Sequence, residues 1–336
     1  MRAAWYERKG AARDVIRVGD MERPEPGPGE VRVRVRASGV NPSDTKQRSG
    51  TGGGGDRAMP FPRIVPNQDG AGEVEAVGAG VSPARVGERV WIYEATWQRA
   101  LGTAAEYTVV PAGQAVPLPP GVDLDVGAGL GVPAMTAHRL LFSDGPITSQ
   151  TVLVSGGAGA VGLSAVQLAK WGGAGQVLAT VNSPEQAEIA RAGGADHTID
   201  YKREDVAARV RALTGAPDGR GVDRVCEVAF ATNLKTNVAV LRRNGVIATY
   251  ESGAGPEVPL PFYDFSLNGL TVHFVLVYAM PAAAHAYAVR DITAALADGA
   301  LRPRIARRFP LAETAAAHEA VEGGAVNGKV LVEVAP

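Results

Sequence analysis

The sequence predicts an α/β protein made of a β-rich domain and a domain built on a doubly wound parallel sheet. Residues 1–125 contain short β segments separated by Gly and Pro, whereas apolar strands alternate with helical patterns from about residue 126. That alternation is typical of a parallel sheet with helices on both faces. We therefore expect one domain over 1–125, completed by 282–336, and a second domain over 126–281.

A glycine-rich turn separates the first strand of the second domain from its first helix. The apolar strand 152–155 leads into Gly157, Gly159 and Gly162, which fit the pattern GxGxxG. The first glycine permits a tight turn, the second lets backbone N–H groups approach a phosphate, and the third lets the helix pack closely on the strand. The helix N-terminus adds partial positive charge. The stretch therefore predicts a dinucleotide pyrophosphate site.

The other elements follow the order that a six-stranded doubly wound sheet requires. Helices are expected over 159–171, 184–193, 203–213 and 232–243, between strands at 152–155, 177–181, 197–200, 222–228, 245–250 and 270–277. The first domain contributes β segments at 29–40, 72–81, 87–93 and 104–111. The C-terminal segment from about residue 282 is predicted to form helices over 284–298 and 311–322 and a strand over 328–334. Because this last strand has no place in the sheet order, we expect it to return to the first domain.

The second strand of the parallel sheet lacks the acidic residue that usually binds the ribose 2′-hydroxyl in NAD sites. Asn182 and Ser183 stand there instead, so a 2′-phosphate would not be repelled. This favours NADPH over NADH. The alternative is that Glu185 or Glu188 folds back to bind the ribose.

Composition excludes several classes of protein. The chain has 336 residues, 46% of them hydrophobic, and a net charge of −1, which gives no electrostatic case for nucleic acid or an anionic membrane. No apolar stretch is long enough to span a membrane, and the N-terminus lacks a signal-peptide core, so the cytoplasm is the expected location.

The single Cys226 excludes an intrachain disulfide and is expected to be a buried thiol. The five histidines lack metal-ligand spacing. The glycine-rich segment 49–57 is either a surface loop or a lid.

Motifs along nearly the whole chain, at residues 38–44, 69–81, 87–90, 133–137, 156–162, 194–196 and 327–330, carry a family resemblance. In this order they resemble the zinc-free, zeta-crystallin-like quinone oxidoreductases of the medium-chain dehydrogenase/reductase superfamily. The resemblance implies a GroES-like β-rich catalytic domain and a Rossmann cofactor domain. Zinc alcohol dehydrogenases of the superfamily have a ligand Cys where this chain has Asn41, and residues 67–70 replace their Gly-His-Glu. The resemblance therefore implies that no metal is bound.

The same resemblance assigns roles to individual residues. Asn41 and Asp44 would flank the cofactor and the quinone, and Asp44 or Lys46 would stabilise the developing oxyanion or relay a proton; alternatively, the last two are a salt-bridge pair on a surface turn. The cofactor residues are Ala158, Gly159, Ala160 and Val161 at the pyrophosphate, Asn182, Ser183 and Tyr201 at the 2′-phosphate, Asn233 at a ribose or phosphate, Thr136, Tyr250, Ser252, Phe274, Val275 and Leu276 at the nicotinamide, and Asn327 and Lys329 on the phosphate side. The chain departs from the family pattern at Glu185, Glu188, Tyr250, Glu251 and Lys46.

The implied activity is NADPH-dependent reduction of a quinone by hydride transfer. A quinone accepts hydride readily because its conjugated ring spreads the charge, so no Lewis acid is needed and the protein mainly positions the reactants. The alternatives are reduction of an alkenal, enone or enoyl thioester, or a crystallin-like or RNA-associated protein that binds NADPH without turnover. Strand 270–277 ends the sheet with an apolar edge, which predicts pairing with a second copy in a homodimer unless 278–288 covers it.

Overall fold

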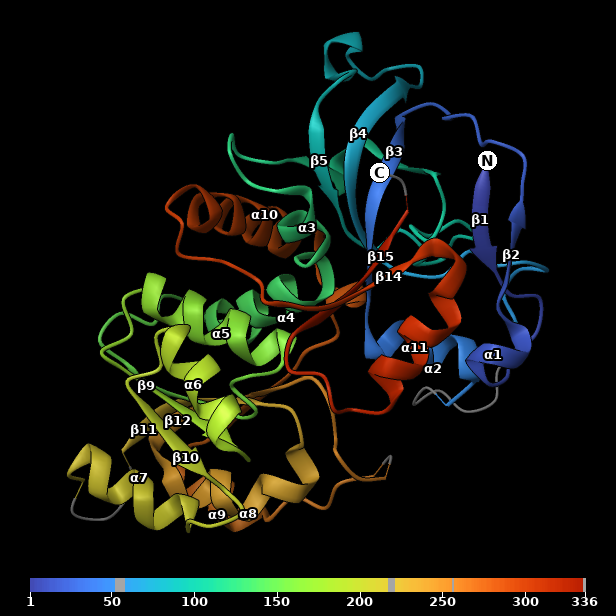
Figure 1. Ribbon diagram of the computed structural model, residues 1–336. Helices are drawn as coiled ribbons and strands as arrows, with labels where there is room; N and C mark the ends of the chain where they lie inside the picture. Colours follow the sequence, from blue (N-terminus) through green and yellow to red (C-terminus); the bar gives the residue numbers. More distant parts are fainter. Residues whose placement is uncertain (52–57, 217–220, 256, 335–336) are drawn as a thin grey trace. The chain divides into compact units, whose positions relative to one another are not determined.

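The chain forms two compact units, each with its own sheet (Figure 1). The computed structural model describes residues 1–51, 58–216, 221–255 and 257–334. The first unit combines Met1–Val132 with Pro303–Pro336, and the second is Pro133–Arg302. Most of the glycine-rich segment 49–57 lies outside the described residues. No helix in the described ranges is long and apolar enough to cross a membrane.

The first unit is built on a mostly antiparallel sheet in the order β14-β15-β3-β4-β5-β7, with β6 paired to β3 and a separate β1-β2 pair. Its strands are β1 (Arg2–Trp5), β2 (Arg17–Asp20), β3 (Glu30–Val40), β4 (Asp69–Val77), β5 (Arg89–Ile92), β6 (Tyr107–Pro111), β7 (Ala115–Pro117), β14 (Ile305–Pro310) and β15 (Lys329–Glu333). Its helices are α1 (Ala12–Val15), α2 (Pro42–Ser49), α3 (Leu124–Ala128) and α11 (Thr314–Glu322), with short 3₁₀ turns η1 (Pro83–Arg85), η2 (Ala112–Gln114) and η4 (Leu311–Glu313).

The C-terminal strand completes the sheet of the first unit. Strand β15 pairs antiparallel with β3 and parallel with β14, so the expectation that it returns to the first domain is confirmed. In β3, alternate residues Val31, Val33 and Val35 are fully buried, which is the period-two pattern of a strand with one face on the core. The long β3 therefore holds the N-terminal and C-terminal segments in one fold.

The second unit is a six-stranded parallel sheet with connecting helices, as expected. Its strand order is β10-β9-β8-β11-β12-β13, which is the doubly wound order with its switch point between β8 and β11. The strands are β8 (Thr151–Val154), β9 (Gln176–Val181), β10 (His197–Asp200), β11 (Val222–Glu227), β12 (Leu241–Thr249) and β13 (Thr271–Phe274). The helices are α4 (Gly131–Phe142), which begins in the first unit, α5 (Ala160–Trp171), α6 (Pro184–Ala192), α7 (Val206–Thr214), α8 (Phe230–Val240), α9 (Phe262–Asn268) and α10 (Ala282–Ala297), with the turn η3 (Val277–Ala279).

Several element ends differ from the sequence expectation for local reasons. Helix α7 starts three residues later than expected because the Asp205 side chain caps it by accepting from Ala208 N. Helix α8 ends at Val240 because Leu241 already pairs with Val222 in the sheet. The last strand is shorter than the expected 270–277, since the chain turns into η3.

The unit boundaries also differ from the expected domain boundaries. Residues 126–132 fold with the first unit, and residues 282–302, which the sequence suggested for the first domain, fold with the second. One reason is that α10 is tied to α4 of the same unit: His138 Nε2 lies 3.0 Å from Asp291 Oδ2, and both residues are buried.

Candidate functional site

The glycine turn between β8 and α5 is shaped by close backbone packing. A Cβ atom on Gly157 would lie 2.6 Å from the Ala179 Cβ, and one on Gly162 would lie 2.1 Å from the Gly156 carbonyl oxygen. Gly156 itself has a φ of +68°, which few other residues adopt. The first and third glycines of the pattern are thus required by the protein's own packing.

Gly159, the second glycine, has no such packing requirement. A Cβ atom there would meet only the Gly156 oxygen, at 3.5 Å, which is an ordinary contact. Gly159 is the N-cap of α5 and supplies no side-chain hydrogen bond, so the first-turn N–H groups lack intrahelical partners. Ala160 and Val161 are partly exposed, while Ala158 is buried. This glycine leaves room and free donors for an anion, which fits a pyrophosphate.

The next two strands place polar side chains at the same carboxyl edge. Asn182 follows β9 and Tyr201 follows β10, and Asn182 Nδ2 donates to Tyr201 Oη across 3.2 Å. The phenol thereby keeps its own hydrogen for a further acceptor, and Tyr201 is 49% exposed. Ser183 is the N-cap of α6 and accepts from Gln186 N. Gln186, which sequence reasoning missed, accepts from Asn182 N at 3.0 Å.

A buried carboxylate that the sequence analysis did not single out lies at the switch point of the sheet. Glu227 ends β11 and is fully buried. Its Oε2 accepts from Ser155 Oγ at 2.9 Å and Asn237 Nδ2 at 2.7 Å, and its Oε1 accepts from Ala229 N at 2.6 Å and Asn233 Nδ2 at 3.0 Å. The available signal was an acidic residue at the end of an apolar strand next to the glycine-turn strand. The neighbouring Cys226 is buried, as expected, and burial raises the pKa of its thiol to about 12.

Most of the residues expected at the nicotinamide lie just after β12, at the end of β13 or directly beyond it. Tyr250 N donates to the Glu227 carbonyl, and Val275 N donates to the Thr249 carbonyl at 2.7 Å. Ser252 Oγ hydrogen-bonds within its own loop, to the carbonyls of Ala254 and Gly255. Phe274 is 71% exposed and Leu276 55%, whereas Val275 and Thr136, the latter on α4, are buried. The second unit thus brings most of these residues to the carboxyl edge of its sheet.

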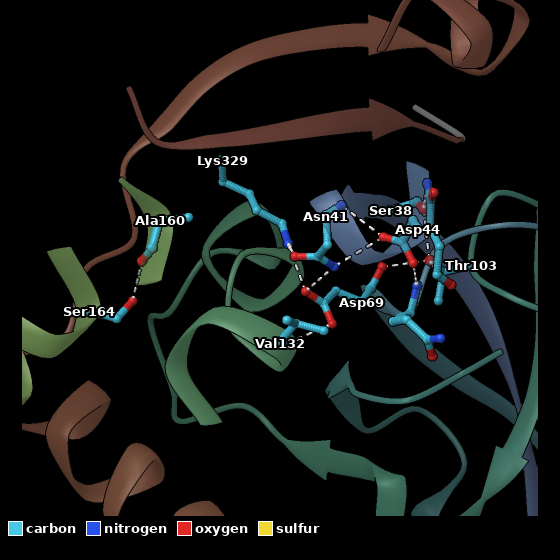
Figure 2. Close-up of polar contacts among 11 residues, drawn as sticks. Ser38, Asn41, Asp44, Asp69, Thr103, Val132, Ala160, Ser164 and Lys329 are labelled. Atoms are coloured by element: carbon cyan, nitrogen blue, oxygen red, sulfur yellow. Dashed lines mark hydrogen bonds and ion pairs between the residues drawn. The ribbon is translucent and has the colours of Figure 1, made fainter. Parts of the chain in front are cut away.

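In the first unit, Asn41 belongs to a buried polar cluster (Figure 2). Lys329 Nζ donates to Asn41 Oδ1 at 2.6 Å and to Asp69 Oδ2 at 2.7 Å. Asn41 Nδ2 donates to Asp69 Oδ2 at 2.9 Å and to Asp44 Oδ2 at 3.1 Å. Asp69 Oδ1 accepts from Val132 N at 2.9 Å. Both N–H groups of the Asn41 amide are therefore committed to carboxylates.

Asp44 is held in place by three backbone and side-chain donors. Its Oδ2 accepts from Asn41 N at 2.8 Å, in addition to Asn41 Nδ2, which forms a capping box at the start of α2. Its Oδ1 accepts from Gln68 N at 3.1 Å. Burial, reinforced by the nearby Asp69 charge, raises the pKa of Asp44 to about 7. Lys46, the third expected catalytic residue, is partly buried on the same helix.

The ammonium group of Lys329, which the resemblance placed on the phosphate side, belongs to this buried cluster. It is 2% exposed and bonds inward to Asp69 and Asn41. Two glycines make room for it: a Cβ on Gly39 would lie 2.6 Å from Lys329 Cε, and one on Gly131 would lie 2.1 Å from Asp69 Oδ1. Asn327, also expected there, accepts from Arg304 through its carbonyl. Within the described residues, no group of three or more His, Cys, Asp or Glu side chains could hold a metal ion.

Comparison with known proteins agrees with this two-unit dehydrogenase architecture. Residues 27–120 match the alcohol dehydrogenase GroES-like domain, and residues 160–293 match the zinc-binding dehydrogenase family. A 2-haloacrylate reductase from Burkholderia sp. is 34% identical over 282 residues, 81% of each chain. A quinone oxidoreductase from Pseudomonas aeruginosa is 34% identical over 269 residues, 79% of this chain and 80% of the relative.

Solved structures give the same result. An NAD-dependent alcohol dehydrogenase superposes with a TM-score of 0.87 at 29% identity, covering 100% of both chains. The Escherichia coli quinone oxidoreductase complexed with NADPH superposes with a TM-score of 0.84 at 25% identity, covering 99% of this chain and 100% of the other. The fold and the glycine turn define a two-domain oxidoreductase. The chain belongs to the medium-chain dehydrogenase/reductase superfamily, in the group that includes the quinone oxidoreductases.

Proposed function

We propose that this protein transfers hydride from NADPH to a quinone without zinc. The observation that carries the proposal is the buried cluster around Asn41. Where zinc dehydrogenases of the superfamily have a ligand Cys, this chain has an amide bonded to the Lys329 ammonium. A fixed cation paired with Asp69 already compensates the buried negative charge there. With no sulfur ligand and a resident ammonium, this cluster is poorly suited to a divalent metal.

NADPH fits the second unit as the hydride source. Its pyrophosphate would bind at Gly159 and the N-terminus of α5, where the backbone donors are free. Its 2′-phosphate would accept from Tyr201 Oη beside Asn182 and Ser183. Tyr250, Ser252, Thr136 and the segment 274–276 would border the nicotinamide. The E. coli quinone oxidoreductase complexed with NADPH supports this choice, whereas binding of NADH would follow if Glu185 or Glu188 reached the ribose.

The proposed reaction requires the protein mainly to position the reactants and to stabilise the developing charge. NADPH supplies the hydride, and a quinone accepts it without Lewis-acid help because its ring spreads the charge. Asn41 is poorly suited to donate a hydrogen bond to substrate, since both its N–H groups are bound. Asp44, whose pKa is raised to about 7, can hold or release a proton near neutral pH. Lys46 is the other candidate for stabilising a developing oxyanion.

Reduction of an activated C=C bond is the second candidate function. It is favoured by the 34% identity to a 2-haloacrylate reductase, whose name describes such a substrate. The same hydride donor would serve both reactions, so the acceptor distinguishes them.

We also propose that the protein is located in the cytoplasm and forms a homodimer. The two copies would pair through β13, which ends the sheet of the second unit.

Initial rates of NADPH oxidation with a panel of quinones, enones and 2-haloacrylate test the proposal. We expect turnover with quinones, unchanged after exhaustive treatment with EDTA or phenanthroline, and well under one zinc per chain by elemental analysis. Turnover confined to the C=C acceptors would select the second function. Absence of turnover with tight NADPH binding would make the protein a non-catalytic binder, and chelator-sensitive turnover with stoichiometric zinc would contradict the metal-free mechanism.

A further inference from the structure

We infer that Glu227 is a positioning residue that turns the side-chain oxygen of Asn233 outward, to accept a hydrogen bond from a hydroxyl of the nicotinamide ribose. The inference rests on the proposed binding of NADPH and deepens it. The resemblance left Asn233 open as a ribose or a phosphate contact. The hydrogen bonds around Glu227 distinguish between the two.

The orientation of the Asn233 amide follows from its partner. Asn233 Nδ2 donates to Glu227 Oε1, an oxygen that also accepts from Ala229 N, so the amide nitrogen faces inward. The Asn233 oxygen is then on the opposite side of the amide. Asn233 is partly exposed, and its oxygen has no hydrogen-bond partner among the described residues and is not a buried unpaired atom. The side chain therefore presents an acceptor at the surface.

The surroundings of this acceptor disfavour a phosphate. At α5 the first-turn N–H groups have no partner among the described residues, but at α8 Phe230 N donates to the Glu251 carbonyl and Ala231 N to the Ser252 carbonyl. The Glu227 carboxylate lies directly beneath, bonded to four neutral donors and to no cation in the described chain. The first two N–H groups of α8 are thus already bonded within the protein, and the exposed oxygen would repel an anion. A neutral hydroxyl donor fits.

The strand order identifies which half of the dinucleotide reaches Asn233. The 2′-phosphate residues follow β9 and β10, and the pyrophosphate turn follows β8. Helix α8 follows β11, on the other side of the switch point. A dinucleotide that lies across the carboxyl edge in this direction brings its nicotinamide ribose to the first turn of α8.

Calorimetric titration of three ligands tests the inference. The ligands are NADPH, adenosine 2′,5′-bisphosphate, which lacks the nicotinamide half, and the reduced 3-acetylpyridine analogue of NADPH, which keeps the ribose hydroxyls but lacks the carboxamide N–H. The variants are N233A and E227Q, with K235A, on the exposed face of the same helix, as the matched control. E227Q replaces one carboxylate oxygen by an amide nitrogen, which cannot accept from the donors that now surround it.

We expect N233A and E227Q to weaken NADPH roughly five- to tenfold, the loss of one hydrogen bond, and to leave the bisphosphate within about twofold of wild type. The acetylpyridine analogue should show the same loss as NADPH, and K235A none. Equal losses on NADPH and the bisphosphate would overturn the inference in favour of general damage to the unit, and an unchanged NADPH affinity in N233A would overturn it outright. Loss of the effect with the analogue would assign Asn233 to the carboxamide and overturn the ribose contact.

Two controls keep the outcomes separate. Thermal unfolding shows whether E227Q folds; if it does not, N233D, which replaces the amide nitrogen that Glu227 holds by an oxygen, takes its place and should weaken NADPH as N233A does. Wild-type protein that binds the bisphosphate but not NADPH would contradict the inference. Wild-type protein that binds neither would instead contradict the proposed function.

Discussion

The ammonium nitrogen of Lys329 lies 2.7 Å from Asp69 Oδ2, and both side chains are almost completely buried. The pair joins β15 to β4 within the first unit, although the residues are 260 positions apart in the chain. Asn41 bridges the two charges by accepting from Lys329 and donating to Asp69. The C-terminal strand is therefore fixed to the N-terminal fold by charge as well as by its backbone hydrogen bonds.

Replacement of Lys329 by methionine should destabilise the protein strongly. The variant K329M leaves the Asp69 carboxylate buried without its counter-ion, a change that typically costs about 3–5 kcal/mol. Urea unfolding measures the effect. The matched control is R13A, which breaks the exposed Arg13–Glu319 pair and should leave the free energy of unfolding nearly unchanged. Similar losses in K329M and R13A would show that the buried pair contributes no more than a surface one.

Asp44 should make the stability of the protein fall as the pH rises from about 4 to about 7. Its pKa is raised to about 7 in the fold, by burial and by Asp69, so the folded state binds the proton more tightly than the unfolded chain. The stabilisation is complete below the unfolded pKa, near 4, and is lost as the pH passes through 7. The difference in melting temperature between wild type and D44N should shrink by several degrees, about 2–4 °C per kcal/mol, across this range.

The matched control for D44N is D20N, because Asp20 is an exposed acid of the same unit. The difference in melting temperature between D20N and wild type should stay nearly constant between pH 4 and 7. If the difference for D44N is equally constant, a raised pKa at Asp44 is contradicted.

The parallel sheet was predictable because buried strands leave continuous apolar runs, and their alternation with helices indicates a parallel sheet with helices on its faces. The position of β15 followed from the same reasoning, since no strand of that sheet remained to pair with it. The polar clusters were not predictable in this way. Glu227 gathers donors from the glycine turn and from α8, and Lys329 meets Asp69 across 260 residues. Such contacts exist only after the units have folded, so no pattern along the sequence predicted them.

Alanine at Gly159 should impair cofactor binding and leave folding nearly intact. The added Cβ meets protein only at 3.5 Å, but it occupies the approach to the free N–H groups of α5. We expect at least about tenfold weaker binding of NADPH, equivalent to about 1.4 kcal/mol, measured by calorimetry. The matched variant G162A places its Cβ 2.1 Å from the Gly156 oxygen and should lower the melting temperature instead. Unchanged NADPH affinity in a folded G159A protein would contradict the pyrophosphate site.

Tyr201 should distinguish NADPH from NADH. Its hydroxyl accepts from Asn182 and keeps its hydrogen for a 2′-phosphate, which NADH lacks. We expect wild type to bind NADPH at least about tenfold more tightly than NADH, and Y201F to weaken NADPH while sparing NADH. Titration of both cofactors into both proteins measures this. Equal losses of affinity for NADPH and NADH in Y201F would show that Tyr201 does not contact the 2′-phosphate. A preference of the wild type for NADH would show that Glu185 or Glu188 binds the ribose.

Proline at Phe274 should dissociate the proposed homodimer. Val275 N bonds inward to the Thr249 carbonyl, so the N–H groups of the alternate residues Val272 and Phe274 point to the other side of β13. That side has no paired strand in the described part of the sheet, and Phe274 and Leu276 expose apolar surface beside it. Antiparallel pairing with a second copy would satisfy these donors.

The variant F274P removes one outward N–H, whereas F274A removes the ring and keeps the N–H. By light scattering at micromolar concentration we expect twice the chain mass for wild type, a weakened dimer for F274A and a monomer for F274P. Proline at Val275 would break the bond to Thr249 inside the sheet and therefore cannot serve as this test. A wild-type monomer would contradict the homodimer. A dimer equally stable in all three proteins would show that the contact lies elsewhere, because an interface along β13 cannot lose its central donor without weakening.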